Sequence, residues 1–503
     1  MLSVTAGPSR NAEQEMSASQ RGLIDTCFEE GQYETGIYVL DSLRSSYRKP
    51  PSVHIRQLLC LALYPPPEEE TDNNPTADTN LPTSPSKLGA RQQRSILIPT
   101  PAASQAALRL LEAFTSTNTS NALLRALPSH PLHWTEQSHD HAPPSYSQDD
   151  EDSAVARQSR SIQECKHCWE ILREGFIRPQ FDPSSSRTTS QIRRTRAGGA
   201  HTGGGEEGEE EFEQPLAVAP HAWPVLKWLI STLEKEESEN ERNDQHRYST
   251  FLLCQIPPPR SAVDKRWDAG PTLEIVVFCL EEGIPQRQQL GIRLLTLLIN
   301  LTATNFIDLS PFLTATFNRL QTMSKPALIF LMTMLPQTSL AIQFKLAFCR
   351  HLLVSTSSAV AKPKPKPKPK TKARPLRQTQ HSTASTQPGG SQNAPEREMI
   401  PAQRYPTFRS ADLLDLLGTP VAGDTKTALD TLRIRYELVL AYASLQTSAD
   451  ETLRDEEWPQ LLSSGRLVAA VEQTFVYSGR AQSEDSRDLD MMRSILLEMV
   501  RTR

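Results

Sequence analysis

Apolar residues recur along this chain at steps of three and four, the spacing that places side chains on one face of an α-helix. Near the N-terminus, two such groups flank Gly31, the first with Leu23 and Phe28 and the second with Ile37 and Leu40. This pattern predicts a helical hairpin, and SVHIRQLLCLALY predicts a third helix that stops at a run of prolines. No segment alternates apolar and polar residues convincingly enough to predict a β-strand.

The densest apolar segments lie in the middle of the chain. GPTLEIVVFCLEEG carries Pro271 near its start and Gly283 just after its end, which are favoured positions at the two ends of a helix. LSPFLTATFNRLQTM predicts a helix capped by Ser310, with Pro311 in the first position. QRQQLGIRLLTLLINLTATNF is apolar nearly all round, which predicts a helix buried on most sides. Five predicted helices follow one another from Gly270 with short connectors.

Short connectors favour antiparallel packing of successive helices. The sequence therefore predicts an all-α fold, an irregular α-solenoid-like stack that resembles armadillo and HEAT proteins in architecture, with a C-terminal helical module and long disordered linkers. No strict repeat consensus is present, so an irregular helical bundle is the alternative. In chain order, the predicted regions are a disordered tail (1–18), an N-terminal helical hairpin region (19–65), a linker (66–95), short helices (96–128), a disordered linker (129–160), a helix (161–182), a disordered linker with arginines followed by acids (183–214), the central helical stack (215–355), a basic Lys-Pro linker (356–404) and the C-terminal helical module (405–503).

Composition supports the predicted linkers. Hydrophobic residues make up 37% of the 503 positions, and 39 positions are proline. Compact domains contain about 45–50% apolar residues, a figure that also counts glycine, so a sizeable minority of this chain is expected to lack a packed core. The net charge of −5 is small, but basic and acidic residues are segregated into blocks.

The sequence also predicts a compartment. It shows neither a signal-peptide core nor a run of about 18 apolar residues, which predicts no secretion and no membrane partner. The seven cysteines are scattered and lie mostly in apolar helical stretches, as reduced thiols do in cytosolic or nuclear proteins. Nucleotide-binding, nucleophile-elbow and zinc-protease motifs are missing from the sequence, which predicts a protein that is not an enzyme and uses no cofactor.

One segment, ECKHCWE, offers weak candidates for a metal site. Cys165 and Cys168 have the Cys-x-x-Cys spacing of zinc ligands. The competing interpretation is a single amphipathic helix whose apolar positions continue at three- and four-residue steps and whose two thiols face the core. We favour the core interpretation, which predicts no metal. The upstream histidines that would complete a zinc site are His130, His133, His139 and His141.

Short motifs in the predicted linkers suggest protein partners. Pro143, Pro144 and Tyr146 form a P-P-x-Y sequence, the kind of polyproline II segment that WW domains bind. Acidic residues follow Ser147, which suits phosphorylation of that serine. Three further candidate phosphosites precede glutamine, a pattern that resembles substrates of DNA-damage checkpoint kinases. They are Thr379, Thr386 and Ser391.

Lysine and proline alternate in AKPKPKPKPKTKARPLRQTQ, which we call the basic tether. Proline at every second residue excludes a helix and favours an extended polyproline II segment. The basic tether is expected to serve as a nuclear import signal, to separate the helical regions that flank it, and to contact nucleic acid through phosphates alone. Its charged residues are Lys362, Lys364, Lys366, Lys368, Lys370, Lys372, Arg374 and Arg377.

Together these features predict a non-enzymatic scaffold or regulatory subunit that resides in the nucleus, shared with the cytoplasm. It would bind protein partners through its helical stack, in a transcription, chromatin or DNA-repair assembly. The alternative is a cytoplasmic ubiquitin-ligase adaptor that recruits a WW-domain protein through PPSY.

Overall fold

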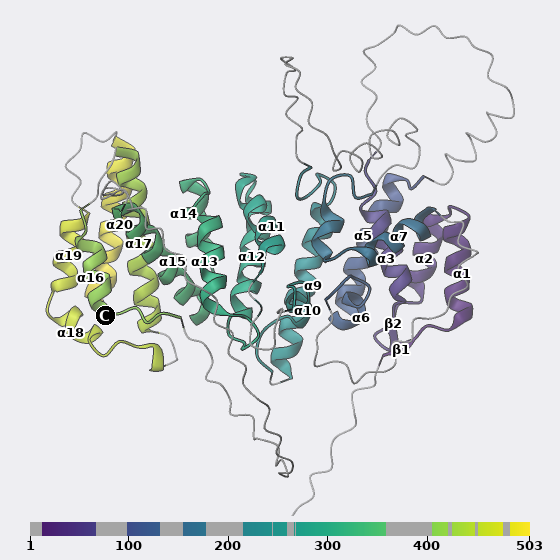
Figure 1. Ribbon diagram of the computed structural model, residues 1–503, viewed down its shortest axis with the longest axis horizontal. Helices are drawn as coiled ribbons and strands as arrows, with labels where there is room; N and C mark the ends of the chain where they lie inside the picture. The colour runs from purple at the N-terminus through teal and green to yellow at the C-terminus, as the bar shows by residue number, and fades with distance from the viewer. Residues whose placement is uncertain are drawn as a thin grey trace, which may run out of the picture. The chain divides into compact units, whose positions relative to one another are not determined.

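The computed structural model describes residues 13–66, 98–130, 154–177, 215–243, 245–258, 266, 268–358, 405–420, 425–447, 451–475 and 483–502. These residues form 18 α-helices, two 3-10 helices and two strands of two residues each (Figure 1). The prediction of a mostly helical protein is therefore confirmed. Strand β1 (Gln14–Glu15) pairs in parallel with β2 (Arg48–Lys49). Two residues are too few to show the alternation that predicts a strand from sequence.

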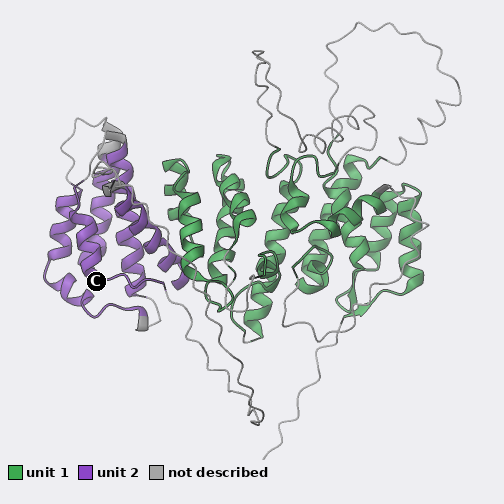
Figure 2. Ribbon diagram, in the orientation of Figure 1, with its two compact units in different colours: residues 1–336 green, residues 337–503 purple. Residues whose placement is uncertain are grey.

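The chain forms two compact units, Met1–Pro336 and Gln337–Arg503 (Figure 2). The sequence groups positions up to 355 with the central stack, whereas the contacts place α15 (Ser339–Ser358) in the second unit, where it packs on α17 (Thr425–Gln446). No helix in the described ranges combines the length and the apolar character needed to cross a membrane.

The first unit contains the predicted N-terminal hairpin and most of the predicted central stack. Helices α1 and α2 pack on each other, α3 packs on α5 and α7, α9 contacts α5, α6 and α12, and α11 contacts α12, α13 and α14. The helices of this unit are α1 (Ala18–Glu29), α2 (Tyr33–Ser42), α3 (Ser52–Ala62), α5 (Pro101–Thr117), α6 (Ser120–Leu124), α7 (Ala154–Glu164), the 3-10 helix η1 (Cys168–Leu172), α9 (Trp223–Arg242), α10 (Thr250–Cys254), α11 (Gly270–Glu281), α12 (Pro285–Leu301), α13 (Leu309–Leu320) and α14 (Lys325–Met334).

The ends of α11 and α13 can be compared with the capping residues predicted from the sequence. Helix α11 has Pro271 in its first turn, and Gly283 follows its end with a φ of 70°, as the sequence predicts. The predicted start of α13 is wrong, because its N-cap is Asp308 and Ser310 already lies within the helix. Helix α12 is buried on most sides, also as predicted.

Gly291 of α12 lies where α12 packs closely on α11. A Cβ at this position would lie 2.9 Å from Cβ of Cys279 and 3.0 Å from the carbonyl oxygen of Val276. Both distances are shorter than normal contacts, and a backbone carbonyl of the neighbouring helix cannot move aside alone.

Gly291→Ala is therefore expected to destabilise the first unit by about 1–3 kcal/mol. Gly22→Ala in α1 is the matched control, because a Cβ there meets nothing within 4 Å. Alanine also has a better helix propensity than glycine, so the control is expected to be neutral or slightly stabilising. Urea unfolding of the full chain, followed by hydrogen exchange in α12, measures both effects. Equal midpoints for the two variants would contradict the close packing of α11 on α12.

The acidic face of α9 connects this helix to three neighbours. Glu239 accepts hydrogen bonds from the backbone N–H and the hydroxyl of Ser120, at 3.1 and 2.6 Å. Glu236 accepts from the Ser249 hydroxyl and from the N–H of Phe251 in α10. Glu237 accepts from the Asn300 amide of α12 at 2.9 Å.

Burial raises the pKa of both Glu236 and Glu237 to about 7, even though their hydrogen bonds lower it. A carboxyl with a raised pKa in the folded state binds its proton more tightly there than in the unfolded state. The free energy of unfolding of the first unit is therefore expected to fall as pH rises from about 4.5 to about 7. Glu237→Gln should reduce this fall by on the order of 1 kcal/mol. Urea titrations at pH 5 and pH 8 measure the change in the free energy of unfolding. A variant with the same pH dependence as the wild type would contradict the role given to Glu237.

The second unit forms around α15 and α17. Helix α17 also contacts α16 and α20, and α19 contacts α16, α18 and α20. Leu413 and Leu417 of α16 are buried in the core of this unit. In addition to α15 and α17, the elements are α16 (Ser410–Gly418), the 3-10 helix η3 (Glu451–Leu453), α18 (Trp458–Ser463), α19 (Arg466–Thr474) and α20 (Ser483–Arg501).

Candidate functional site

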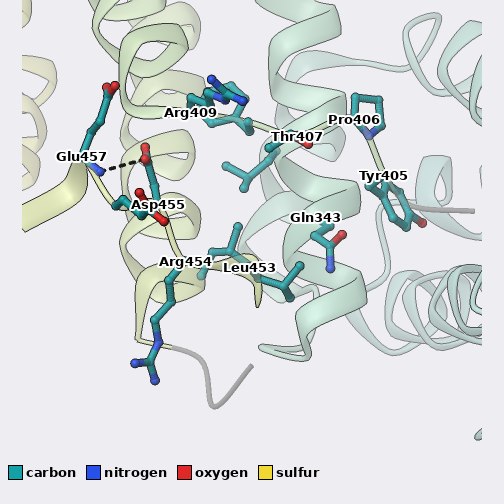
Figure 3. Close-up of a pocket in the computed structure, with 13 residues that line it drawn as sticks. Gln343, Tyr405, Pro406, Thr407, Arg409, Leu453, Arg454, Asp455 and Glu457 are labelled. Atoms are coloured by element: carbon teal, nitrogen blue, oxygen red, sulfur yellow. Dashed lines mark hydrogen bonds between the residues drawn. The ribbon is translucent and has the colours of Figure 1, made fainter. Parts of the chain in front are cut away.

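A groove of about 420 Å³ lies on the second unit, between the two segments that precede α16 and α18. One wall is residues 405–409, which lead into α16, and the other is residues 453–457, which lead into α18. Leu346 of α15 and Leu445 of α17 also line the groove, and both leucines are otherwise buried in the unit. Figure 3 shows the two walls approaching each other near Arg409 and Asp455, with Gln343 between them at the other end, near Tyr405 and Leu453.

The carboxylate of Asp455 holds the two walls together. Its Oδ2 accepts hydrogen bonds from the backbone N–H of Ser410 at 2.7 Å, from the Ser410 hydroxyl at 2.6 Å and from the Tyr442 hydroxyl at 2.6 Å. Its Oδ1 accepts from the N–H of Glu457 at 3.0 Å (Figure 3). The N–H of Asp455 itself donates to the Gln446 side chain at 2.7 Å, so α16, α17 and the turn before α18 meet at one residue.

These contacts also determine the protonation states of Asp455 and Tyr442. Partial burial raises the pKa of Asp455, but the hydrogen bonds from Ser410, Tyr442 and Glu457 lower it more in total, to about 2. Burial, and then the hydrogen bond to Asp455, raise the pKa of the Tyr442 hydroxyl well above its usual range. Asp455 is therefore an anion and Tyr442 a neutral donor at neutral pH.

Aromatic packing anchors both walls on α17. The ring of Phe408, from the first wall, lies edge-to-face on Tyr442 with centroids 5.4 Å apart. The ring of Trp458, which follows the second wall, packs on Tyr442 in the same way at 5.3 Å. Such pairs contribute about 0.5–1.5 kcal/mol each beyond their burial. The two ring contacts thus fix both walls of the groove on the same residue of α17.

Charged side chains surround the groove. Arg454 pairs with Glu451 at 3.9 Å, and all the hydrogen bonds of Asp455 described above are internal to the unit. The guanidinium of Arg409 and the carboxylates of Glu456 and Glu457 form no hydrogen bond or ion pair within the described part of the chain. These three side chains are the charged groups of the lining that have no partner in the described part of the chain.

The structure places Cys165 and Cys168 differently from the predicted single helix. Helix α7 ends at Glu164, and a separate 3-10 helix begins at Cys168. The single-helix prediction is therefore wrong, because a tertiary contact competes with helix continuation: the N–H of Cys168 donates to the buried Gln255 side chain at 2.8 Å. Cys168 is fully buried, as predicted, whereas Cys165 is half-buried.

The described surroundings of the two thiols contain no further cluster of candidate ligands, and His133, His139 and His141 lie outside the described residues. Among the described residues, no group of three or more histidine, cysteine, aspartate or glutamate side chains is placed to hold a metal ion. Burial raises the pKa of Cys165 to about 12 and that of Cys168 well above its usual value, so both are neutral thiols. None of the seven cysteines forms a disulfide.

The other candidate residues named from the sequence lie outside the described residues. These are the P-P-x-Y residues Pro143, Pro144 and Tyr146, the phosphosites Ser147, Thr379, Thr386 and Ser391, and the basic tether from Lys362 to Arg377. Sequence reasoning did not find the groove. One signal was present: DEEWP, from Asp455 to Pro459, has the form of a helix start, with an acidic residue before a proline.

Comparison with protein-family models, with curated proteins and with solved structures finds no match to this chain.

Proposed function

We propose that this protein is a non-enzymatic scaffold or regulatory subunit that binds protein partners. The observation that carries the proposal is the groove of the second unit, whose walls are fixed by Asp455 and Tyr442 before any ligand arrives. Preorganisation of this kind lowers the entropic cost of binding, because the side chains at the interface are already ordered. Its lining combines buried leucines with a few available polar groups, which is typical of binding sites.

The first unit is proposed to add a second binding surface. Its helices from α11 to α14 are joined by short connectors, and neighbours such as α11 and α12 pack on each other. We interpret this unit as an irregular α-solenoid-like stack, a fold class that presents extended surfaces to other proteins.

Affinity purification of the tagged full chain, followed by quantitative mass spectrometry, tests the proposal. We expect partners that the wild type captures and that are reduced at least fivefold by Thr407→Trp, a change that fills the groove from an exposed position. The matched control is Gln473→Trp, at an exposed position of α19 that does not line the groove. Identical partner sets for both variants would contradict binding at the groove.

Nuclear residence and membership of a transcription, chromatin or DNA-repair assembly are part of the proposal, and the basic tether supports them. Replacing its eight lysines and arginines by glutamine, with every proline kept, is expected to move a fluorescently tagged chain largely from the nucleus to the cytoplasm. The control replaces the prolines of residues 362–377 by alanine and keeps the charges, so that it changes the spacing alone. Nuclear fluorescence measured by microscopy distinguishes the two. A glutamine variant that stays nuclear would remove the support for an import signal.

A further inference from the structure

We infer that the groove of the second unit binds an extended peptide that carries a lysine or arginine, with the peptide backbone paired to residues 407–408 and its basic side chain beside Glu456 and Glu457. The inference rests on the proposed function, and it specifies the chemistry of the partner.

The first wall offers backbone groups to a peptide. Residues 405–409 contain no helical turn, and Arg409 has extended backbone angles of φ −115° and ψ 164°. The N–H and C=O groups of Thr407 and Phe408 form no hydrogen bond within the described part of the chain. In an extended segment the N–H and C=O of one residue point to the same side, and those of the next residue point to the other. The inference places the N–H and C=O of one of these two residues on the groove side, as in the edge strand of a peptide-binding site.

The wall cannot slide or refold to satisfy these groups itself. Pro406 has no N–H and restricts the preceding residue to extended conformations. The N–H of Arg409 is already bonded to the Asp412 carboxylate at 3.0 Å, and the Phe408 ring is held against Tyr442. An external strand is thus the natural partner for the backbone of residues 407–408.

The charges of the groove select the side chain. Arg454 is paired with Glu451, and the carboxylate of Asp455 is occupied by Ser410, Tyr442 and the backbone of Glu457. Of the available groups, one cation, Arg409, stands against two carboxylates, Glu456 and Glu457, which gives one negative charge in excess. The Asp455 anion adds a second, because its hydrogen-bond partners are all neutral. A basic side chain complements this excess, whereas a nucleic-acid phosphate would be repelled by it.

Peptide selection by the full chain tests the inference. The probes are three bead-displayed pools of nonapeptides with randomised flanks, whose central residue is lysine, glutamine or glutamate. We expect the wild type to enrich the lysine pool over the glutamate pool about fivefold, the equivalent of about 1 kcal/mol. Backbone N-methylation next to the centre of an enriched peptide is expected to weaken its binding about tenfold, because it removes a strand-pairing hydrogen bond.

Charge reversal provides the matched comparison. Glu456→Lys with Glu457→Lys should reverse the preference toward the glutamate pool, and both positions are exposed, so the fold is retained. Asp490→Lys with Glu498→Lys, at exposed positions of α20, makes the same change in net charge away from the groove lining and should leave the preference unchanged.

Four results would overturn the inference: equal enrichment of the three pools, an unchanged preference after reversal at Glu456 and Glu457, binding that tolerates N-methylation, or tighter binding of a 20-nucleotide single-stranded RNA than of any peptide. Loss of protein partners with Thr407→Trp, combined with failure of the peptide pools, would leave the proposed function standing and would reject only the chemistry inferred for the partner.

Discussion

Lys345→Met is expected to lower the free energy of unfolding of the second unit by about 3–5 kcal/mol. Lys345 of α15 donates to the Glu437 carboxylate of α17 at 2.5 Å, and the two side chains are only 5% and 8% exposed. Removal of the lysine leaves a buried carboxylate without its lysine counter-ion, and the desolvation cost of that charge is then less well offset. Hydrogen exchange in α17, measured on the full chain across a urea series, reports the loss.

A double variant separates the cost of the unpaired Glu437 charge from the cost of lost packing between α15 and α17. Lys345→Met combined with Glu437→Leu removes both charges and keeps similar volumes, so most of the stability should return. If the double variant is as unstable as Lys345→Met alone, packing between α15 and α17 and not the buried charge is responsible, and the assignment is wrong.

Asp455→Ala is expected to destabilise the second unit by about 2–4 kcal/mol and to loosen both walls of the groove. The carboxylate accepts hydrogen bonds from both Ser410 donors, from Tyr442 and from the N–H of Glu457, and the buried hydroxyl of Tyr442 would lose this acceptor. Faster hydrogen exchange at the amides of Ser410 and Glu457 is the direct readout. Glu456→Gln, which changes a neighbouring exposed carboxylate, should stay within about 0.5 kcal/mol of the wild type.

The same carboxylate makes the second unit sensitive to acid. Because the folded-state pKa of Asp455 is lowered from 3.8 to about 2, its contribution is complete above pH 4 and declines as pH falls toward 2. In the Asp455→Ala variant, the free energy of unfolding should not show this part of the decline between pH 4 and pH 2. An acid titration that is identical in the variant and the wild type would contradict the role given to Asp455.

Sequence pattern predicted the helices well where periodicity and caps agreed. Helix α11 is such a case, since its apolar positions, Pro271 and Gly283 all indicate the same limits. The pattern failed at α7, where apolar spacing continues past Glu164 but the chain turns to bring the Cys168 N–H to Gln255. That partner lies far away in the sequence, and local periodicity contains no information about it.

The groove is a second feature that local sequence pattern could not predict, because it depends on contacts between distant segments. Its walls, around Phe408 and Asp455, are separated by the whole of α16 and α17. The packing of Phe408 and Trp458 on Tyr442 and the hydrogen bonds of Asp455 bring them together. Each wall taken alone has the appearance of an ordinary connector before a helix. The sequence reveals residues that bind by themselves, such as those of the basic tether, and cannot reveal a site formed by two distant connectors.

Site-specific photo-cross-linking tests the central claim most directly, that this protein acts by binding a partner at the groove of the second unit. A benzophenone amino acid would replace Thr407 on the first wall in the full chain expressed in cells, with Gln473 of α19 as the control position. We predict a discrete cross-linked protein at position 407 that is absent at position 473. Cross-linking at neither position, or the same products at both, would contradict a partner bound in the groove.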